Sequence, residues 1–108
     1  MKSKILSLLG LARRAGRLAP GHDAAIESIV KNKAALCVLC LDASKRLERE
    51  IRHACSYNNK NIPVVKADFE AKELSAAIGT KAAVAAVNDE GFAKKLLTLF
   101  ETNTKGKE

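Results

Sequence analysis

Residues 8–21 read Leu8-Leu9-Gly10-Leu11-Ala12-Arg13-Arg14-Ala15-Gly16-Arg17-Leu18-Ala19-Pro20-Gly21. The apolar residues in the first half recur at helical spacing, so they predict a helix that ends in two arginines, where the helix dipole favours cations. Gly16 suits the position just after a helix, and Gly21 suits the start of a second one. A cationic helix end close to a helix N-terminus suits a polyanion, and for a chain of this size we expect that polyanion to be RNA.

The positive charge is concentrated in the first half of the chain. The 108 residues include 19 Lys and Arg and 12 Asp and Glu, a net charge of +7. Residues 1–54 contain 11 basic and 5 acidic residues, a net of +6, whereas residues 55–108 contain 8 and 7, a net of +1. This length allows one domain with one core. A one-sided basic surface favours binding to nucleic acid or to an anionic membrane.

No apolar run approaches the ~18 residues that a transmembrane helix needs. The short apolar segment after Lys4 is followed by arginines and by no small-residue cleavage site, so we expect a mature cytoplasmic start and no membrane partner. The three cysteines lack the spacing of a disulfide framework, which fits a reducing compartment.

Helices and short apolar strands alternate along the chain. Helices are expected at residues 4–15, 22–31, 45–57, 69–78 and 89–100, strands at 36–41, 62–65 and 82–87, and an extended link or edge strand at 17–19. This order predicts the α/β class, as a single-domain three-layer α/β/α sandwich with a small, mostly four-stranded mixed sheet. The domain is expected to span residues 1–100, and residues 101–108 are expected to form a disordered polar tail.

Polar residues mark the expected helix starts. Either Asp42 or Ser44 is expected to cap the helix over 45–57, Asp68 the following helix, and Asn88 the last one. Gly10 lies inside a helix, where it costs ~1 kcal/mol relative to alanine, so we expect another element to pack closely against it.

Enzyme motifs are missing from the chain. It has no G-x-G-x-x-G, Walker A, G-x-S-x-G or H-E-x-x-H pattern. Cys37 and Cys40 lie in one predicted strand, and positions three apart on a strand point to opposite faces, so the two thiols cannot share a metal. We therefore expect a non-catalytic protein with no cofactor and no metal site.

The basic residues form groups near the helix ends and loops. These groups are Arg13, Arg14 and Arg17; Lys31 and Lys33; Lys45 and Arg46; and Lys81. Arginine suits two-pronged phosphate contacts and lysine acts as a point charge. The few aromatic residues give no base-stacking platform, so recognition is expected to rest on phosphates, RNA shape and a helix N-terminus.

With these motifs placed, the chain resembles the YlxQ-type bacterial branch of the ribosomal kink-turn-binding superfamily over about residues 3–100. The resemblance rests on residues 8–16, Gly21 at a helix start, Asp42-Ala43-Ser44 after an apolar strand, Asn61-Ile62-Pro63-Val64, Leu74 through Gly79, and Asp89-Gly91-Phe92-Ala93-Lys94. It implies an α/β/α sandwich that binds RNA with kink-turn-like internal loops. It also implies a link to the ribosome or to the transcription–translation machinery.

The chain departs from that family at the helix that recognises RNA. The resemblance implies that this helix opens with Gly-x-Asn-Glu, whose Asn and Glu contact sheared G·A pairs, with a lysine one turn later. The matching positions here are Gly21, His22, Asp23 and Ala24, with Glu27 at the lysine position. Asp23 is an acidic variant of the Asn, whereas the Glu and the Lys are absent. The family's late recognition loop matches residues 78–82.

Together these observations predict a non-catalytic, ribosome-associated RNA-binding protein that binds structured ribosomal or messenger-leader RNA. The residues expected to bind RNA are Arg13, Arg14, Arg17, Gly21, His22, Asp23, Lys31, Lys33, Ser44, Lys45, Thr80 and Lys81. The departures at Ala24 and Glu27 favour an alternative, a protein-interaction adaptor of the transcription–translation machinery that has lost specific RNA readout. Ribosomal proteins or transcription factors are the expected protein partners.

Overall fold

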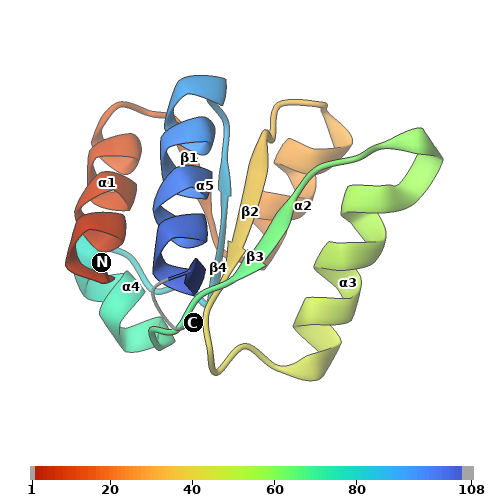
Figure 1. Ribbon diagram of the computed structural model, residues 1–108. Helices are drawn as coiled ribbons and strands as arrows, with labels where there is room; N and C mark the ends of the chain where they lie inside the picture. The colour runs from red at the N-terminus through yellow and green to blue at the C-terminus, as the bar shows by residue number, and fades with distance from the viewer. Residues whose placement is uncertain (1, 106–108) are drawn as a thin grey trace.

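Helices cover both faces of a central sheet in the computed structural model, which describes residues 2–105 (Figure 1). The elements follow in the order α1 (Lys2–Arg14), β1 (Leu18–Pro20), α2 (His22–Val30), β2 (Leu36–Leu39), α3 (Lys45–Ser56), the short 3-10 helix η1 (Tyr57–Asn59), β3 (Val64–Lys66), α4 (Ala71–Ile78), β4 (Val84–Val87) and α5 (Glu90–Lys105). The predicted alternation of helices and strands is therefore confirmed, with boundaries that shift by a few residues.

The sheet is mixed and four-stranded, as predicted. Its strand order is β1-β4-β2-β3, with β2 parallel to β3 and the other neighbours antiparallel. All residues of the two central strands, β2 and β4, are buried. Because Pro20 has no N–H to donate, its place in the edge strand β1 avoids the loss of a ladder hydrogen bond.

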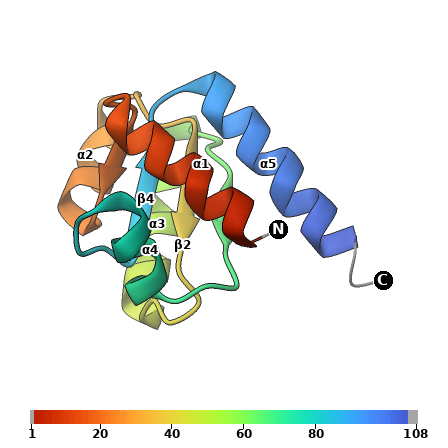
Figure 2. The same ribbon diagram turned by 90° about the vertical axis from the view of Figure 1, so that its left-hand side faces the viewer.

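Two apolar clusters fill the space between the sheet and the helices, and they confirm the three-layer sandwich. Ile5 and Leu9 of α1, Leu74 of α4 and Leu96 of α5 pack on one face of the sheet. On the other face, side chains of α2 and α3 pack with residues that alternate along β2 and β4. Figure 2 shows α1 and α5 side by side on the first face.

Gly10 permits the close approach of α1 and α4. A Cβ atom at this position would lie 2.9 Å from the carbonyl oxygen of Ala77, which is closer than real Cβ contacts. The expectation that an element packs closely against Gly10 is thus confirmed.

The helix caps differ in part from the expected ones. Ser44 caps α3 by accepting a hydrogen bond from the Leu47 N–H at 3.0 Å, whereas Asp42 accepts one from the Ala71 N–H at 2.9 Å and so caps α4. Because Asp42 reaches the start of α4 from a distant loop, and because Glu70 and Glu73 form a capping box there, Asp68 is not the cap.

The prediction that Asn88 caps α5 is also wrong. Asp89 accepts a hydrogen bond from the Phe92 N–H at 2.8 Å. The Asn88 side-chain amide instead donates to the Ser28 hydroxyl at 2.9 Å and links β4 to α2. The Asn88 side chain therefore forms a tertiary hydrogen bond with Ser28 instead of capping the helix that follows it.

Helix α5 continues through Lys105, into the segment that was expected to be a disordered tail. The sequence has no glycine or proline between Gly91 and Gly106 that would stop the helix earlier. The rest of the expected tail, residues 106–108, lies outside the described residues. No helix of the described chain is both long and apolar enough to cross a membrane.

Candidate functional site

Three segments that are distant in the sequence meet at one end of the sheet, here called the Gly21 end: residues 20–23, 41–45 and 79–83. The N–H of Gly21 donates to the carbonyl of Val84 at 2.8 Å, and the N–H of Cys40 donates to the carbonyl of Ala83 at 2.9 Å. The strand register places the last residue of β2 opposite the first residue of β4. The start of α2, the β2–α3 loop and the α4–β4 loop are therefore neighbours.

Gly21 gives α2 an open N-terminus. Its φ of 92° lies in a region that L side chains rarely adopt, so the residue type is required by the backbone. The helix starts without a side-chain cap. The N–H groups of a first helical turn point outward and favour an anion, so this end of α2 can receive a phosphate or another acceptor group.

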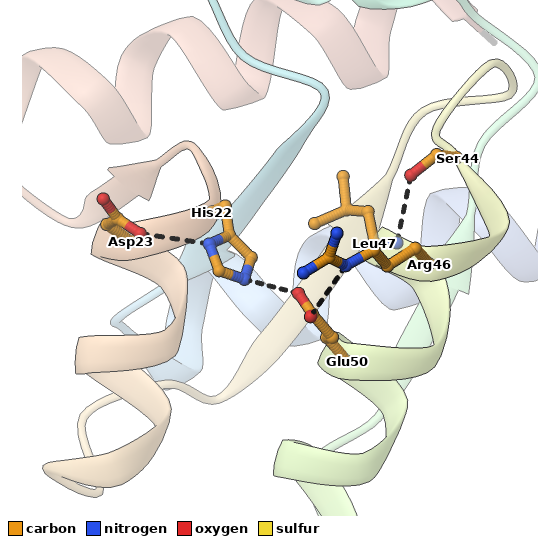
Figure 3. A network of polar contacts seen from close by, with 6 residues as sticks. All are labelled: His22, Asp23, Ser44, Arg46, Leu47 and Glu50. Atoms are coloured by element: carbon orange, nitrogen blue, oxygen red, sulfur yellow. Dashed lines mark hydrogen bonds and ion pairs between the residues drawn. The ribbon is translucent and has the colours of Figure 1, made fainter.

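His22 links the first turn of α2 to α3 (Figure 3). Its Nδ1 lies 3.0 Å from Oδ1 of Asp23, and its Nε2 lies 2.8 Å from Oε1 of Glu50. Arg46 approaches the other oxygen of Glu50 at 3.4 Å. An imidazole donates through both nitrogens only when it is protonated, so this pair of contacts is complete in the cationic form. The ring thereby positions the exposed carboxylate of Asp23.

The β2–α3 loop is held by two side chains. Ser44 uses its hydroxyl oxygen as the cap of α3, and Asp42 ties the loop to α4. Lys45 follows in the first turn of α3 and is exposed. Sequence analysis placed Ser44 and Lys45 in the site, and the structure brings both to the Gly21 end.

The α4–β4 loop turns at Gly79, whose φ of 79° is the left-handed conformation that ends α4. The hydroxyl oxygen of Ser75 accepts a hydrogen bond from the Ala82 N–H at 3.1 Å and holds the loop against α4. Thr80 is half-buried in this loop, whereas Lys81 is exposed. The loop is thus anchored on both sides of Lys81.

The arginines predicted for the site lie at the opposite end of the sheet, here called the Arg17 end: residues 13–17, 31–35 and 87–89. The carbonyl of Arg17 accepts from the Asn88 N–H at 2.8 Å, and the Ala35 N–H donates to the carbonyl of Val87 at 2.8 Å. Helix α1 ends here, and β1 then carries the chain along the sheet to Gly21. The predicted site therefore divides into two groups.

The cations of the Arg17 end differ in their partners. Lys31 is paired with Glu27 at 3.0 Å, so each neutralises the charge of the other. In the described part of the chain, Arg13, Arg14, Arg17 and Lys33 are exposed and have no ion pair. They leave this end with unbalanced positive charge.

The cysteines are core residues. As expected from strand alternation, Cys37 and Cys40 pack in opposite clusters. Burial raises the pKa of Cys40 to about 12, and the hydrogen bond with Cys55 together with burial raises that of Cys37. Their sulfurs are thus protonated at neutral pH. The described residues contain no group of His, Cys, Asp and Glu able to hold a metal ion.

The sequence patterns did not identify Glu50 as a partner of His22, nor Arg46 as a further partner of Glu50. Both residues are separated from His22 by most of α2 and by β2, so no local pattern relates them to it. Arg46 precedes Glu50 by four residues, so both lie on the same face of α3. This i,i+4 spacing is the one sequence pattern that could have indicated their ion pair.

The similarity to known proteins extends over nearly the whole chain. Residues 3–97 match the family described as "Ribosomal protein L7Ae/L30e/S12e/Gadd45 family". The chain is 38% identical over 95 residues to "RNA-binding protein YlxQ" of Bacillus subtilis, covering 87% of this chain and 92% of that protein. It is 34% identical over 100 residues to a protein of the same name from Enterococcus faecium, with 93% and 94% covered.

Two solved structures have the same fold. A protein of unknown function from Bacillus halodurans C superposes with a TM-score of 0.81 and 32% identity, over 91% of this chain and 97% of that one. The Giardia lamblia 15.5kD RNA binding protein superposes with a TM-score of 0.73 and 18% identity, over 94% of this chain and 85% of that one. At that identity, the second likeness concerns the fold alone.

Proposed function

This chain belongs to the ribosomal protein L7Ae/L30e/S12e/Gadd45 family, and on that premise we propose that it binds structured RNA containing kink-turn-like internal loops. The observation that supports this most is the convergence at the Gly21 end of an uncapped helix N-terminus, an exposed carboxylate and two anchored loops. Two bacterial relatives that match nearly the whole chain are named RNA-binding proteins.

The two ends of the sheet have different roles in this proposal. The Gly21 end contacts the irregular loop, where the RNA exposes base edges. The Arg17 end contacts phosphates of an adjoining helix, which carry no sequence information. Helix α2 connects the two ends, and its nine residues span about 13 Å. An RNA lying along α2 would therefore meet both groups.

Base recognition is assigned to Asp23. Its side chain is fully exposed at the first turn of α2, and His22 orients it. A carboxylate accepts hydrogen bonds from guanine N–H groups, whereas Ala24 beside it can form no such contact. We expect one carboxylate, the amides of the α2 N-terminus and the shape of the loop to give modest specificity, in a non-catalytic role on ribosomal or messenger-leader RNA in the cytoplasm.

The test is binding to two RNA hairpins that differ only in the internal loop. One carries a kink-turn with sheared G·A pairs, and the other replaces the loop with Watson–Crick pairs. The chain should bind the first hairpin tighter by ~10-fold or more at moderate salt, because each good base contact is worth ~1–3 kcal/mol. Equal binding of both hairpins would overturn the loop specificity. Binding of neither would overturn RNA binding and would favour the adaptor role.

A further inference from the structure

Helices α1 and α5 lie side by side on the face of the molecule away from α2 and α3 (Figure 2), and residues of both helices line an apolar groove. Two adjoining hollows share Leu8, Leu11 and Lys95 and so form one continuous groove. Leu11 is 47% exposed. Phe92 at one end and Leu99 at the other extend the apolar floor along α5.

Lysines line the rim of this groove. Lys4 comes from α1, and Lys94 and Lys95 come from α5. All three are exposed and have no ion pair with any residue that the structure describes. Asp89 also lies at the groove, but its Oδ2 is occupied by the N–H of Phe92 at the start of α5. With three lysines against this one carboxylate, the rim has a net positive charge.

We propose that the groove binds an acidic amphipathic helix of a protein partner. The apolar floor of the groove would contact apolar side chains of the bound helix. The lysines on the two rims would pair with carboxylates on the two flanks of that bound helix. The lining residues run from Ser3 to Leu11 along α1 and from Asp89 to Leu99 along α5, a length of about 12–15 Å that matches two to three turns of a bound helix. An RNA would place phosphates on the rim but would leave Leu8 and Leu11 without an apolar partner.

The groove belongs to the α1–α5 layer, on the other side of the sheet from α2, so a protein bound in the groove leaves the Gly21 end open to RNA. Only the end of the groove at Leu11 and Asp89 adjoins the Arg17 end, where phosphate contacts are proposed. The inference does not depend on RNA binding. If both hold, the chain would connect a structured RNA to a protein.

The test uses a displayed library of random peptides of about 16 residues, a length that spans ~24 Å as a helix. The full chain is the bait, and the Leu11→Ser variant serves for counter-selection because Leu11 is half-exposed and its loss should not unfold the protein. Enriched peptides should be acidic, with apolar residues three and four apart. A binder made as a synthetic peptide should shift amide resonances of Leu8, Leu11 and Lys95 in spectra of the labelled full chain.

Two further variants separate the groove from other surfaces. The double variant Lys94→Glu with Lys95→Glu should weaken the peptide by ~10-fold or more, since it reverses the rim charge, whereas Arg49→Glu on the exposed side of α3 should not. The proposal is overturned if selection enriches no acidic amphipathic pattern over the Leu11→Ser counter-selection, or if resonance shifts lie elsewhere. It is equally overturned if the kink-turn hairpin shifts the groove resonances, because the groove would then be an RNA surface.

Discussion

At the scale of single residues, His22 holds the exposed carboxylate of Asp23, the side chain to which base contact is proposed. Its ring lies between Asp23 and Glu50, so the first turn of α2 is joined to α3 by a polar contact across the surface. Glu27, which replaces the lysine implied by the family pattern, does not stand as an isolated negative charge. Lys31 neutralises it one turn along the helix.

Asp23→Ala should reduce loop specificity without affecting general affinity. The change removes the acceptor for guanine N–H groups, so binding of the kink-turn hairpin should weaken by ~5- to 100-fold, the equivalent of ~1–3 kcal/mol. Binding of the matched duplex hairpin should stay the same or improve slightly, because a negative charge near phosphate is lost. Titration of both RNAs against this variant and against Glu101→Ala, an exposed acid on α5, checks the result. A parallel loss of affinity for both RNAs would contradict the role of Asp23.

Stability should fall in acid through two paired carboxylates. Hydrogen bonds from Arg52 and Lys66 lower the pKa of Glu48 below its usual 4.5. The backbone N–H of Glu70 and the side chain of Lys2 lower the pKa of Glu73 in the same way. Since these folded-state values lie below the unfolded ones, the contribution is complete above about pH 4.5 and is lost as pH falls through the folded-state pKa.

Urea unfolding over a pH series measures this effect in Glu48→Gln with Glu73→Gln. The variant should be less stable than the parent at neutral pH, and the two curves should converge in strong acid. A stability difference that stays constant from neutral to acid pH would show that the carboxylate charges do not contribute.

At the scale of elements, the periodicity of apolar residues was enough to predict five helices, the strands and the mixed sheet, because each element buries one regular face. The caps were less predictable. Asn88 donates a hydrogen bond to Ser28, and Asp42 accepts one from the Ala71 N–H. The residues of each pair are distant in the sequence and become neighbours only after folding. The RNA-binding residues stay predictions from residue type, and their division between the two ends of the sheet depends on β1, which separates Arg17 from Gly21.

Gly10→Ala should destabilise the packing of α1 on α4. Alanine gains ~1 kcal/mol in helix propensity, but its Cβ would lie 2.9 Å from a backbone oxygen of α4. Overpacking costs ~1–3 kcal/mol, so the net loss is about 0–2 kcal/mol, and we expect the upper part of that range because the clash is with backbone rather than with a flexible side chain. Thermal unfolding should then show a lower Tm, by roughly 4–8 °C for each kcal/mol. Ser7→Ala, at an exposed position of the same helix, is the matched control. An unchanged Tm in Gly10→Ala would contradict this prediction, because it would mean that α4 shifts to make room for the Cβ atom with no net loss of stability.

At the scale of the whole molecule, the unbalanced cations are separated in space from the residues that we propose to recognise bases. The unbalanced cations Arg13, Arg14, Arg17 and Lys33 lie at one end of the sheet, and the open helix terminus with Asp23 and Lys81 lies at the other. The molecule measures 34 × 31 × 28 Å, so both ends are within reach of one folded RNA. Affinity and specificity should therefore respond to different substitutions.

Arg13→Ala with Arg14→Ala should weaken binding to the kink-turn and the duplex hairpins alike. The slope of log K against log[salt] should become shallower by up to ~1–2 units, since fewer counterions are released. The ratio of the two affinities should not change. Arg49→Ala with Lys72→Ala removes two exposed cations elsewhere and should leave the slope closer to that of the parent. A slope unaltered by the Arg13 and Arg14 changes would exclude these residues from the RNA contact.

Crosslinking in cells, followed by sequencing of the bound RNA, tests the central claim most directly. The parent chain and a variant with Asp23→Ala and Lys81→Ala are compared at equal expression. The account predicts that the parent recovers a defined structured RNA with the crosslinks centred on an internal loop, and that the variant loses this enrichment. Recovery of no RNA, or of the same RNA at the same sites by both proteins, would contradict it.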